Sequence, residues 1–316
     1  MQTVRGEVRP ERLGTTLIHE HVLVDFVGAR DANPGRYNAD EVFRVALPKL
    51  RELQSRGCRA LVECTPAHLG RDPHLLRRLS EACDLQIITN TGLYGANGDK
   101  HVPEYALAES PEQLSDRWTA EYRHGIDGSG VRPGFLKIGV DAGPLSGIDL
   151  KLVTAACLCH RATGLRMHVH CGDGRAALSI LELAKRQQVS PQAFVWVHAQ
   201  SERDRGVHLR TVEAGAWLEF DGISQSTHQL HLEAVTDLIK AGYLDQLLIS
   251  QDSGWYRVGE PGGGQYNGYV YLFDAFLPAL RSAGVTDAQI RKLVVTNPTR
   301  ALTFSERAPG SRDGKS

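Results

Sequence analysis

The sequence predicts an α/β protein, a (β/α)8 TIM barrel formed by one domain. Eight short apolar runs rich in β-branched residues recur along the 316 residues, each succeeded by a longer stretch of helical character. This alternation predicts a parallel sheet, and eight strand–helix units in roughly 250–300 residues is the size of such a barrel. A doubly wound open sheet is the alternative. However, no run carries the Gly-x-Gly-x-x-Gly turn, and no low-complexity linker divides the chain.

The predicted strands succeed one another at intervals that leave room for a helix. In chain order they are TTLIHEH (15–21), RALVECT (59–65), QIITNTG (86–92), GFLKIGV (134–140), LRMHVHC (165–171), AFVWVHA (193–199), AWLEFDG (216–222) and QLLISQD (246–252). Apolar residues at three- and four-residue spacing predict helices between them, for example over 39–57 and 176–188. Pro298 suits the first turn of a terminal helix. We expect the domain to cover residues 1–306, with a flexible tail at 307–316.

The composition excludes several classes of partner. The net charge is −1 and no Lys/Arg-rich run occurs, so we expect neither a nucleic-acid nor a membrane partner. No apolar run approaches the ~18 residues of a membrane span, and the first residues lack the apolar segment of a secretory signal. The six cysteines include no C-x-x-C pair, which favours reduced thiols and a cytoplasmic protein.

Polar side chains interrupt the apolar runs at or near the carboxyl ends of the predicted strands. Residues two apart in a strand face the same side, so His19 and His21 should point together into the barrel while Glu20 faces outward toward the helices. Active sites of barrel enzymes are formed at this end. The other polar residues at equivalent positions are Lys137, His170, His198 and Asp252.

Each of these six residues alone has a structural explanation, such as a hydrogen-bonded core histidine. Burying six polar side chains without hydrogen-bond partners would cost several kcal/mol of folding free energy, so these residues must satisfy one another or a shared ion. Four imidazoles with oxygen donors suit Zn²⁺ or a similar divalent metal, and six candidates exceed one tetrahedral site, which favours two metals. Lys137 does not fit as an ammonium ion, with a reference pKa of ~10.4, because a cation repels metals. It must be neutral or chemically converted to an anion.

The motifs together resemble the phosphotriesterase-like branch of the amidohydrolase superfamily, which includes lactonase members. The resemblance rests on HEH in the first strand, GFLKIG in the fourth, MHVHCGDG in the fifth, VWVHAQ in the sixth, ISQDSG in the eighth and the final TNPTRAL. It runs nearly from end to end of the chain. HxH alone would be a weak signal, but the set is specific. The fold it implies is the same distorted barrel.

The resemblance also assigns the ligands of two divalent metals, expected to be Zn²⁺. His19 and His21 would bind the more buried metal with Asp252, while His170 and His198 would bind the more exposed one. Lys137 would be carboxylated, and the resulting carbamate would bridge both ions, which removes the charge objection. His168 also faces inward, one layer deeper, and we expect it to support the ligands or to pack.

The activity implied is that of a binuclear metal-dependent hydrolase, in which a metal-bridged hydroxide attacks a lactone or other carboxylic ester. Asp252 would take the proton and pass it to the leaving group. The alternatives within the family are the hydrolysis of phosphotriesters and the hydrolysis of N-acyl amides. Two departures argue against a phosphotriesterase proper: Ser201 stands where an acidic residue is expected, and Gly222 replaces a histidine after the seventh strand.

Contacts to a small-molecule substrate are expected from two loops. Tyr94, in TGLYG after the third strand, resembles the substrate-contacting tyrosine of the lactonase members, and a packed aromatic is an equally good explanation. Trp255, Tyr256 and Arg257 come after the eighth strand, at the position of a loop that would cover the site. The role of the glycine-rich segment 259–269 stays open. The resemblance further implies a homodimer.

Two functions from other classes remain as alternatives. Lys137 could form a Schiff base in an aldolase-like barrel, but this leaves four histidines and an aspartate unexplained. A borohydride-trapped adduct would support it. A binding protein without turnover is the other alternative, and the retention of every ligand argues against it.

Overall fold

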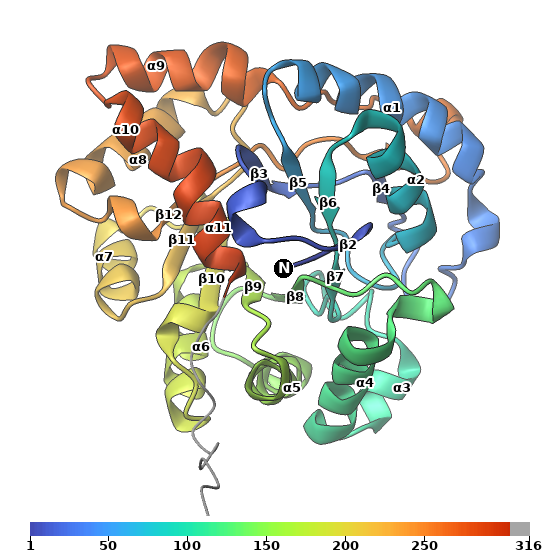
Figure 1. Ribbon diagram of the computed structural model, residues 1–316. Helices are drawn as coiled ribbons and strands as arrows, with labels where there is room; N and C mark the ends of the chain where they lie inside the picture. Colours follow the sequence, from blue (N-terminus) through green and yellow to red (C-terminus); the bar gives the residue numbers. More distant parts are fainter. Residues whose placement is uncertain (304–316) are drawn as a thin grey trace, which may run out of the picture.

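The computed structural model describes residues 1–303, and these fold into a ring of parallel strands enclosed by helices (Figure 1). The predicted (β/α)8 barrel is confirmed. Its strands are β3 (Thr16–Glu20), β5 (Ala60–Glu63), β6 with β7 (Gln86–Ile88, Asn90–Thr91), β8 (Phe135–Val140), β9 (Met167–Cys171), β10 (Phe194–Val197), β11 (Trp217–Phe220) and β12 (Leu247–Ile249). The predicted domain end at 306 and the tail at 307–316 lie outside the described residues.

The helices form the outer layer of the barrel (Figure 1). They are α1 (Ala39–Ser55), α2 (Pro73–Cys83), α3 (Glu104–Ala108), α4 (Pro111–His124), α5 (Gly147–Thr163), α6 (Gly174–Arg186), α7 (Arg205–Glu213), α8 (His228–Lys240), α9 (Leu277–Ser282), α10 (Asp287–Arg291) and α11 (Asn297–Leu302). Short π-helical segments at 272–276 and 292–296 precede α9 and α11. Pro298 lies in the first turn of α11, as predicted. Within residues 1–303, no helix is both long and apolar enough to cross a membrane.

The barrel is distorted because the ladder of hydrogen bonds around it is interrupted twice. Strands β7 to β12 form one continuous parallel sheet, and β3, β5 and β6 form another. The first interruption is a single residue between β6 and β7. The second lies between β12 and β3, where the Asp252 amide donates to the His19 carbonyl at 3.1 Å and the His19 amide donates to Ser250 Oγ at 3.0 Å. Single hydrogen bonds near the strand ends therefore join β12 to β3, in place of a continuous ladder.

Two short pairs of strands cover the ends of the barrel. Strands β1 (Gln2–Thr3) and β2 (Gly6–Glu7) are antiparallel, and the Val4 amide ties them to β6 through the Ile87 carbonyl at 2.9 Å. At the carboxyl end, β4 (Leu23–Val24) pairs in parallel with β13 (Tyr256–Arg257). This second pair folds the segments after β3 and β12 against each other, beside the predicted site.

The predicted alternation at the end of β3 is kept, because His19 and His21 line the cavity at the strand ends and Glu20 does not. Strand β3 shifts its register against β5 between Leu17 and Glu20. Glu20 is completely buried and contacts the turn after β12, a partner that the apolar run alone does not predict.

Candidate metal centre

A small cavity of about 130 Å³ lies at the carboxyl ends of the barrel strands. It is lined by polar groups on one side and by apolar side chains, including Val24, Phe26 and Leu69, on the other. All six predicted ligands line it: His19, His21, Lys137, His170, His198 and Asp252. The fold thus brings together residues that lie far apart in the sequence, on or just after β3, β8, β9, β10 and β12.

The strands position these side chains in two ways. Lys137 and His170 lie on the adjacent strands β8 and β9, where Lys137 pairs with His168 and Gly139 pairs with His170. His198 and Asp252 instead lie just beyond the ends of β10 and β12, with left-handed φ values of 63° and 51°. Such a conformation is strained for a residue with a Cβ and persists only where its surroundings enforce it, as at functional sites.

The distances within the cluster match a set of donors that face a common point. His21 Nε2 is 3.0 Å and His19 Nε2 is 3.8 Å from Asp252 Oδ1. Asp252 Oδ1 is buried and has no hydrogen-bond partner among residues 1–303. The His170 and His198 rings lie edge to face with centroids 4.5 Å apart. A metal ion would give these inward-facing atoms the partner they otherwise lack.

A hydrogen bond at Nδ1 orients each of the four imidazoles, leaving Nε2 for the cavity. His19 donates to Glu219 Oε1 at 2.5 Å, and His198 donates to Asp221 Oδ1 at 2.5 Å. His21 Nδ1 is 2.8 Å from Thr65 Oγ1, and His170 Nδ1 is 3.2 Å from Tyr94 Oη. Ligating histidines in metalloproteins are fixed in this manner, which sets the tautomer and ring orientation.

The pKa directions suit metal ligands at His21, His170 and Asp252. The pKa of His19 differs, because against the lowering effect of burial the charges of Cys64, Glu219 and Asp221 raise it well above its usual value. Burial lowers the pKa of His21 to about 4, against the raising effect of the Asp252 carboxylate. Burial also lowers the pKa of His170, and the neighbouring His198 adds to this effect. Burial alone would raise the pKa of Asp252, but the His21 imidazole, with Nε2 3.0 Å from Oδ1, holds it below its usual value. Neutral imidazoles beside an ionised carboxylate are the forms that bind Zn²⁺.

Lys137 is the residue for which a chemical modification is most needed. Its side chain is 2% exposed, and its Nζ lies 3.5 Å from His19 Nε2. No carboxylate in residues 1–303 lies within ion-pair distance of this amine. A buried, unpaired ammonium ion is costly.

Two carboxylates, Glu219 and Asp221, accept hydrogen bonds from predicted ligands. The sequence analysis did not assign either of them. Glu219 on β11 also faces His168, whose Nδ1 is 3.6 Å from Glu219 Oε2, while the His168 ring packs on Phe135. Asp221, two residues on, lies 3.3 Å from His19 Nδ1 as well as contacting His198. The signal that could have found them is their spacing, two apart in the apolar run WLEFD, which is the same spacing as that of His19 and His21.

A second chain of polar groups reaches His21. Thr65 Oγ1 donates to Glu63 Oε1 at 2.5 Å, and Glu63 Oε1 also accepts the Val22 amide at 3.3 Å. Burial raises the pKa of Glu63 to about 7. Glu63 and Thr65 are again two residues apart at a strand end, so the same spacing rule would have found them.

Two of the four predicted substrate contacts line the cavity. Tyr94 and Trp255 do so, and the Trp255 ring lies 4.8 Å from the ring of His21 and stacks on Phe26 at 5.6 Å. Tyr256 and Arg257 do not line it, and their contact with a substrate stays a prediction. They form β13, in which Tyr256 is buried, and the Arg257 guanidinium lies 5.9 Å from the centroid of the Trp255 ring.

The segment 259–269 contacts backbone groups just after the ends of β3 and β12. Tyr269 is fully buried, and its Oη donates to the His21 carbonyl at 2.7 Å. The Asn267 amide donates to the Gly254 carbonyl at 2.9 Å. This part of the loop therefore anchors the backbone of a predicted ligand.

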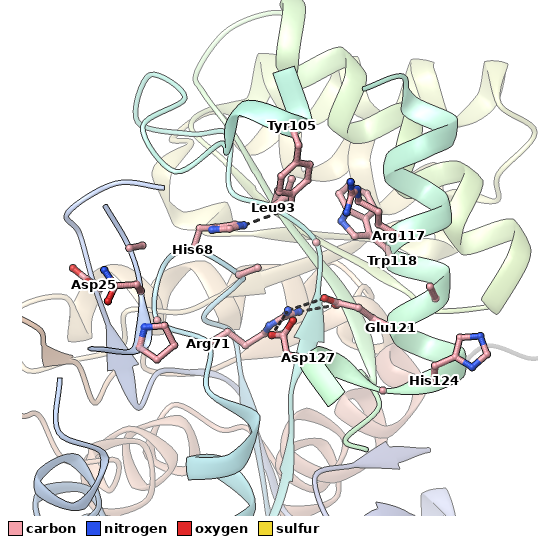
Figure 2. A pocket seen from close by; sticks show the side chains of 18 of the residues that line it. Asp25, His68, Arg71, Leu93, Tyr105, Arg117, Trp118, Glu121, His124 and Asp127 are labelled. Atoms are coloured by element: carbon pink, nitrogen blue, oxygen red, sulfur yellow. Dashed lines mark hydrogen bonds and ion pairs between the residues drawn. The ribbon is translucent and has the colours of Figure 1, made fainter. Parts of the chain in front are cut away.

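A larger cavity of about 630 Å³ lies between the loop after β5 and helix α4 (Figure 2). Its main charged groups are paired within the protein. Arg71 donates both terminal nitrogens to Glu121 at 2.8 Å, and Arg117 pairs with Glu109. His68 Nε2 lies 3.4 Å from Tyr105 Oη (Figure 2). This cavity consequently offers little unpaired charge and none of the predicted ligands.

Comparison with known proteins agrees with the geometry. The sequence matches the phosphotriesterase family over residues 1–302. The phosphotriesterase homology protein of Mycobacterium tuberculosis is 29% identical over 95% of this chain and 96% of its own. The N-acetyltaurine hydrolase of Danio rerio is 24% identical, covering 96% and 98%.

A solved structure of similar fold belongs to a mutant of the PTE-like lactonase of Deinococcus radiodurans. It superposes with a TM-score of 0.86 at 28% identity, covering 96% of this chain and 99% of that one. The family match spans essentially all the described residues, from the N-terminal hairpin to α11. The chain is therefore a hydrolase that belongs to the phosphotriesterase family.

Proposed function

We propose that this protein is a binuclear metal-dependent hydrolase that opens a lactone or cleaves another carboxylic ester. The observation that carries the proposal is the convergence of six donor residues on one cavity, with each imidazole fixed at Nδ1. Such fixation is characteristic of the histidine ligands of metal sites. It also argues against an aldolase, because a Schiff-base lysine does not require four oriented histidines.

The residues divide between two metal positions. His19, His21 and Asp252 would hold one ion, and His170 and His198 the other, with the Lys137 carbamate between them. Groups of His19, His21 and Asp252, and of His19, His198 and Asp221, have ligand atoms within 4.8 Å of one another, which supports ion binding here. Two divalent ions, most simply Zn²⁺, would polarise the scissile carbonyl and lower the pKa of water in the cavity.

Asp252 is the residue placed to move a proton. Its free Oδ1 faces the cavity, where it can accept a proton as water oxygen adds to the carbonyl carbon. When the ring C–O bond breaks, the departing oxygen receives that proton from Asp252. His198 Nδ1 is held by Asp221, so its imidazole keeps its orientation throughout.

Several features favour a carboxylic ester over a phosphotriester. Tyr94 Oη lies beside His170 at the cavity wall, where it can bind the substrate carbonyl or ring oxygen. The apolar lining of Val24, Phe26, Leu69 and Trp255 suits the hydrocarbon part of a lactone. Ser201 is exposed and donates to the His198 carbonyl at 2.8 Å, so it does not replace the missing acid. The similarity to a lactonase supports the same substrate class.

A comparison of rates tests the proposal. The protein is expressed with zinc and bicarbonate and assayed on γ- and δ-lactones, with and without phosphate groups, on an aryl phosphotriester and on N-acyl amino acids. We expect the highest kcat/KM for a lactone, and Tyr94→Phe, which removes the hydroxyl beside His170, should lower it. A phosphotriester or an N-acyl amino acid in the lead would contradict the lactone assignment, and turnover of none would reject the substrate class.

A further inference from the structure

Glu20, the residue between the two histidines of HEH, has its carboxylate fully engaged inside the protein. It is 0% exposed. Oε1 accepts hydrogen bonds from Ser250 Oγ at 2.8 Å and from the Gln251 amide at 3.0 Å, and Oε2 accepts the Ser253 amide at 2.7 Å. The three donors belong to one short turn, and they surround a single residue of it, Asp252.

This turn is the place where β12 and β3 lack a paired ladder. The Asp252 amide donates to the His19 carbonyl, and the His21 amide donates to the Ser253 carbonyl at 2.9 Å. Ser250 Oγ accepts the His19 amide while donating to Glu20. Each of these bonds between the turn and β3 therefore involves Glu20 or a backbone group of its two neighbours.

Asp252 itself needs such support. Its φ of 51° is unfavourable for a residue with a Cβ, and within the described chain its Oδ1 has no hydrogen bond of its own to hold the side chain. The position of Oδ1, 3.0 Å from His21 Nε2, is thus determined by the backbone of the turn.

A carboxylate is the one side chain of this length that can hold the turn. Backbone N–H groups approach both of its oxygens, at Gln251 and at Ser253. Glutamine would place its NH₂ group against one of these donors in either orientation of the amide. Aspartate is one methylene shorter and would not reach.

We infer that Glu20 is a positioning residue for Asp252: it fixes the turn that presents Oδ1 to the metal centre and to the reacting water. It acts through Asp252 and touches neither substrate nor metal. The inference rests on the proposed function for its effect on turnover, whereas its effect on the turn can be measured in the protein without any substrate.

The test compares Glu20→Gln with Asp149→Asn, a buried carboxylate exchanged for an amide in α5, where it accepts a hydrogen bond from Ser146 Oγ and none from the turn. Amide hydrogen exchange is followed by mass spectrometry. In Glu20→Gln we expect exchange over 250–253 to accelerate about 10-fold or more, since a backbone N–H of the turn loses its acceptor. Exchange in β9 should be unchanged, and Asp149→Asn should leave the turn unaffected.

A double-mutant cycle on the best substrate gives the second readout. Displacement of a reacting group can cost about 100-fold, so Glu20→Gln should lower kcat by about 10-fold to 100-fold with KM little changed. In an Asp252→Asn background it should have almost no further effect, because the residue it positions is already inactive. If Glu20→Gln does not fold, Ser250→Ala removes one donor and should shift both readouts in the same direction.

Unchanged exchange over 250–253 in Glu20→Gln would overturn the inference whatever the substrate. The inference would also be overturned if the kcat losses of Glu20→Gln and Asp252→Asn multiplied in the double mutant, since Glu20 would then act independently of Asp252. Failure of the proposed function would appear differently, as accelerated exchange in a protein that hydrolyses no member of the panel.

Discussion

Asp252 carries the largest share of the proposed chemistry among single residues. It lines the cavity, its Oδ1 has no hydrogen-bond partner within residues 1–303, and nearby His21 keeps its pKa low. A carboxylate in this position is ionised at neutral pH and can accept a proton.

Asp252→Asn should retain bound metal but lose most turnover. The amide has nearly the same shape, yet it cannot accept the proton, and general acid–base groups contribute about 100-fold to 10,000-fold to rate. The measurement is kcat on the best lactone together with metal content. A kcat equal to that of the wild type would rule out the proton-transfer role.

The residues of the site can be predicted from sequence because each is a polar interruption of an apolar strand. This holds for His19, His21, Lys137, His170 and His198, which the structure brings together. Glu219 and Asp221 obey the same spacing, yet the sequence analysis does not assign them. The histidines and the lysine match a known set of metal ligands, whereas two acids in a strand have no such pattern to distinguish them from ordinary buried carboxylates.

At the scale of elements, the positions of the strands are predictable, whereas the paths of the loops after them are not. Apolar runs locate the eight strands, and helical spacing locates α1 and α6. The β4–β13 pair joins segments more than 200 residues apart, and the bulge in β3 depends on its packing against β5, so no local pattern records either feature. The sequence analysis therefore does not show that Tyr256 and Arg257 form a strand outside the cavity lining.

Helix α5 supplies a prediction about pH. Asp149 is buried in its first turn, Oδ1 lacks a hydrogen bond within the described chain, and burial, with Asp141 and Asp99 adding to it, raises its pKa from 3.8 to about 6. Between these values the folded state keeps a proton that the unfolded state loses. The free energy of unfolding should therefore fall as the pH rises from about 4 to about 6.

Asp149→Asn should remove this loss. One pKa unit corresponds to about 1.4 kcal/mol, and the lost interaction with the helix dipole offsets part of the gain. We expect the variant to be more stable than the wild type by about 1–2 kcal/mol at pH 7.5 and nearly equal to it at pH 4. Denaturant unfolding at both pH values measures the difference. A variant that is less stable at pH 7.5 would show that the carboxylate is stabilised in the folded state.

At the scale of the whole barrel, the residues that close the ring of strands also form the proposed metal site. His19 and Asp252 join β3 to β12 through their backbones and face the cavity with their side chains. Metal binding should thus stabilise the closed barrel, and metal removal should weaken it at its least paired junction.

Removal of metal by a chelator should lower the Tm measurably. A ligand present at 100 times its Kd stabilises the folded state by about 2.7 kcal/mol, and each kcal/mol moves the Tm of a large domain by about 2–4 °C. We expect a fall of about 5 °C or more, reversed by added Zn²⁺, in differential scanning calorimetry. A Tm that does not respond to chelator or metal would contradict ion binding at the strand ends.

Metal stoichiometry in the wild type and in Lys137→Ala tests the central claim most directly. Both proteins are expressed with zinc and bicarbonate, dialysed, and analysed for metal per chain by mass spectrometry. The account predicts two tightly held ions in the wild type and at most one in the variant, because the bridging carbamate is lost. Two tightly held ions in Lys137→Ala would refute the bridge, and fewer than two in the wild type would contradict the binuclear centre itself.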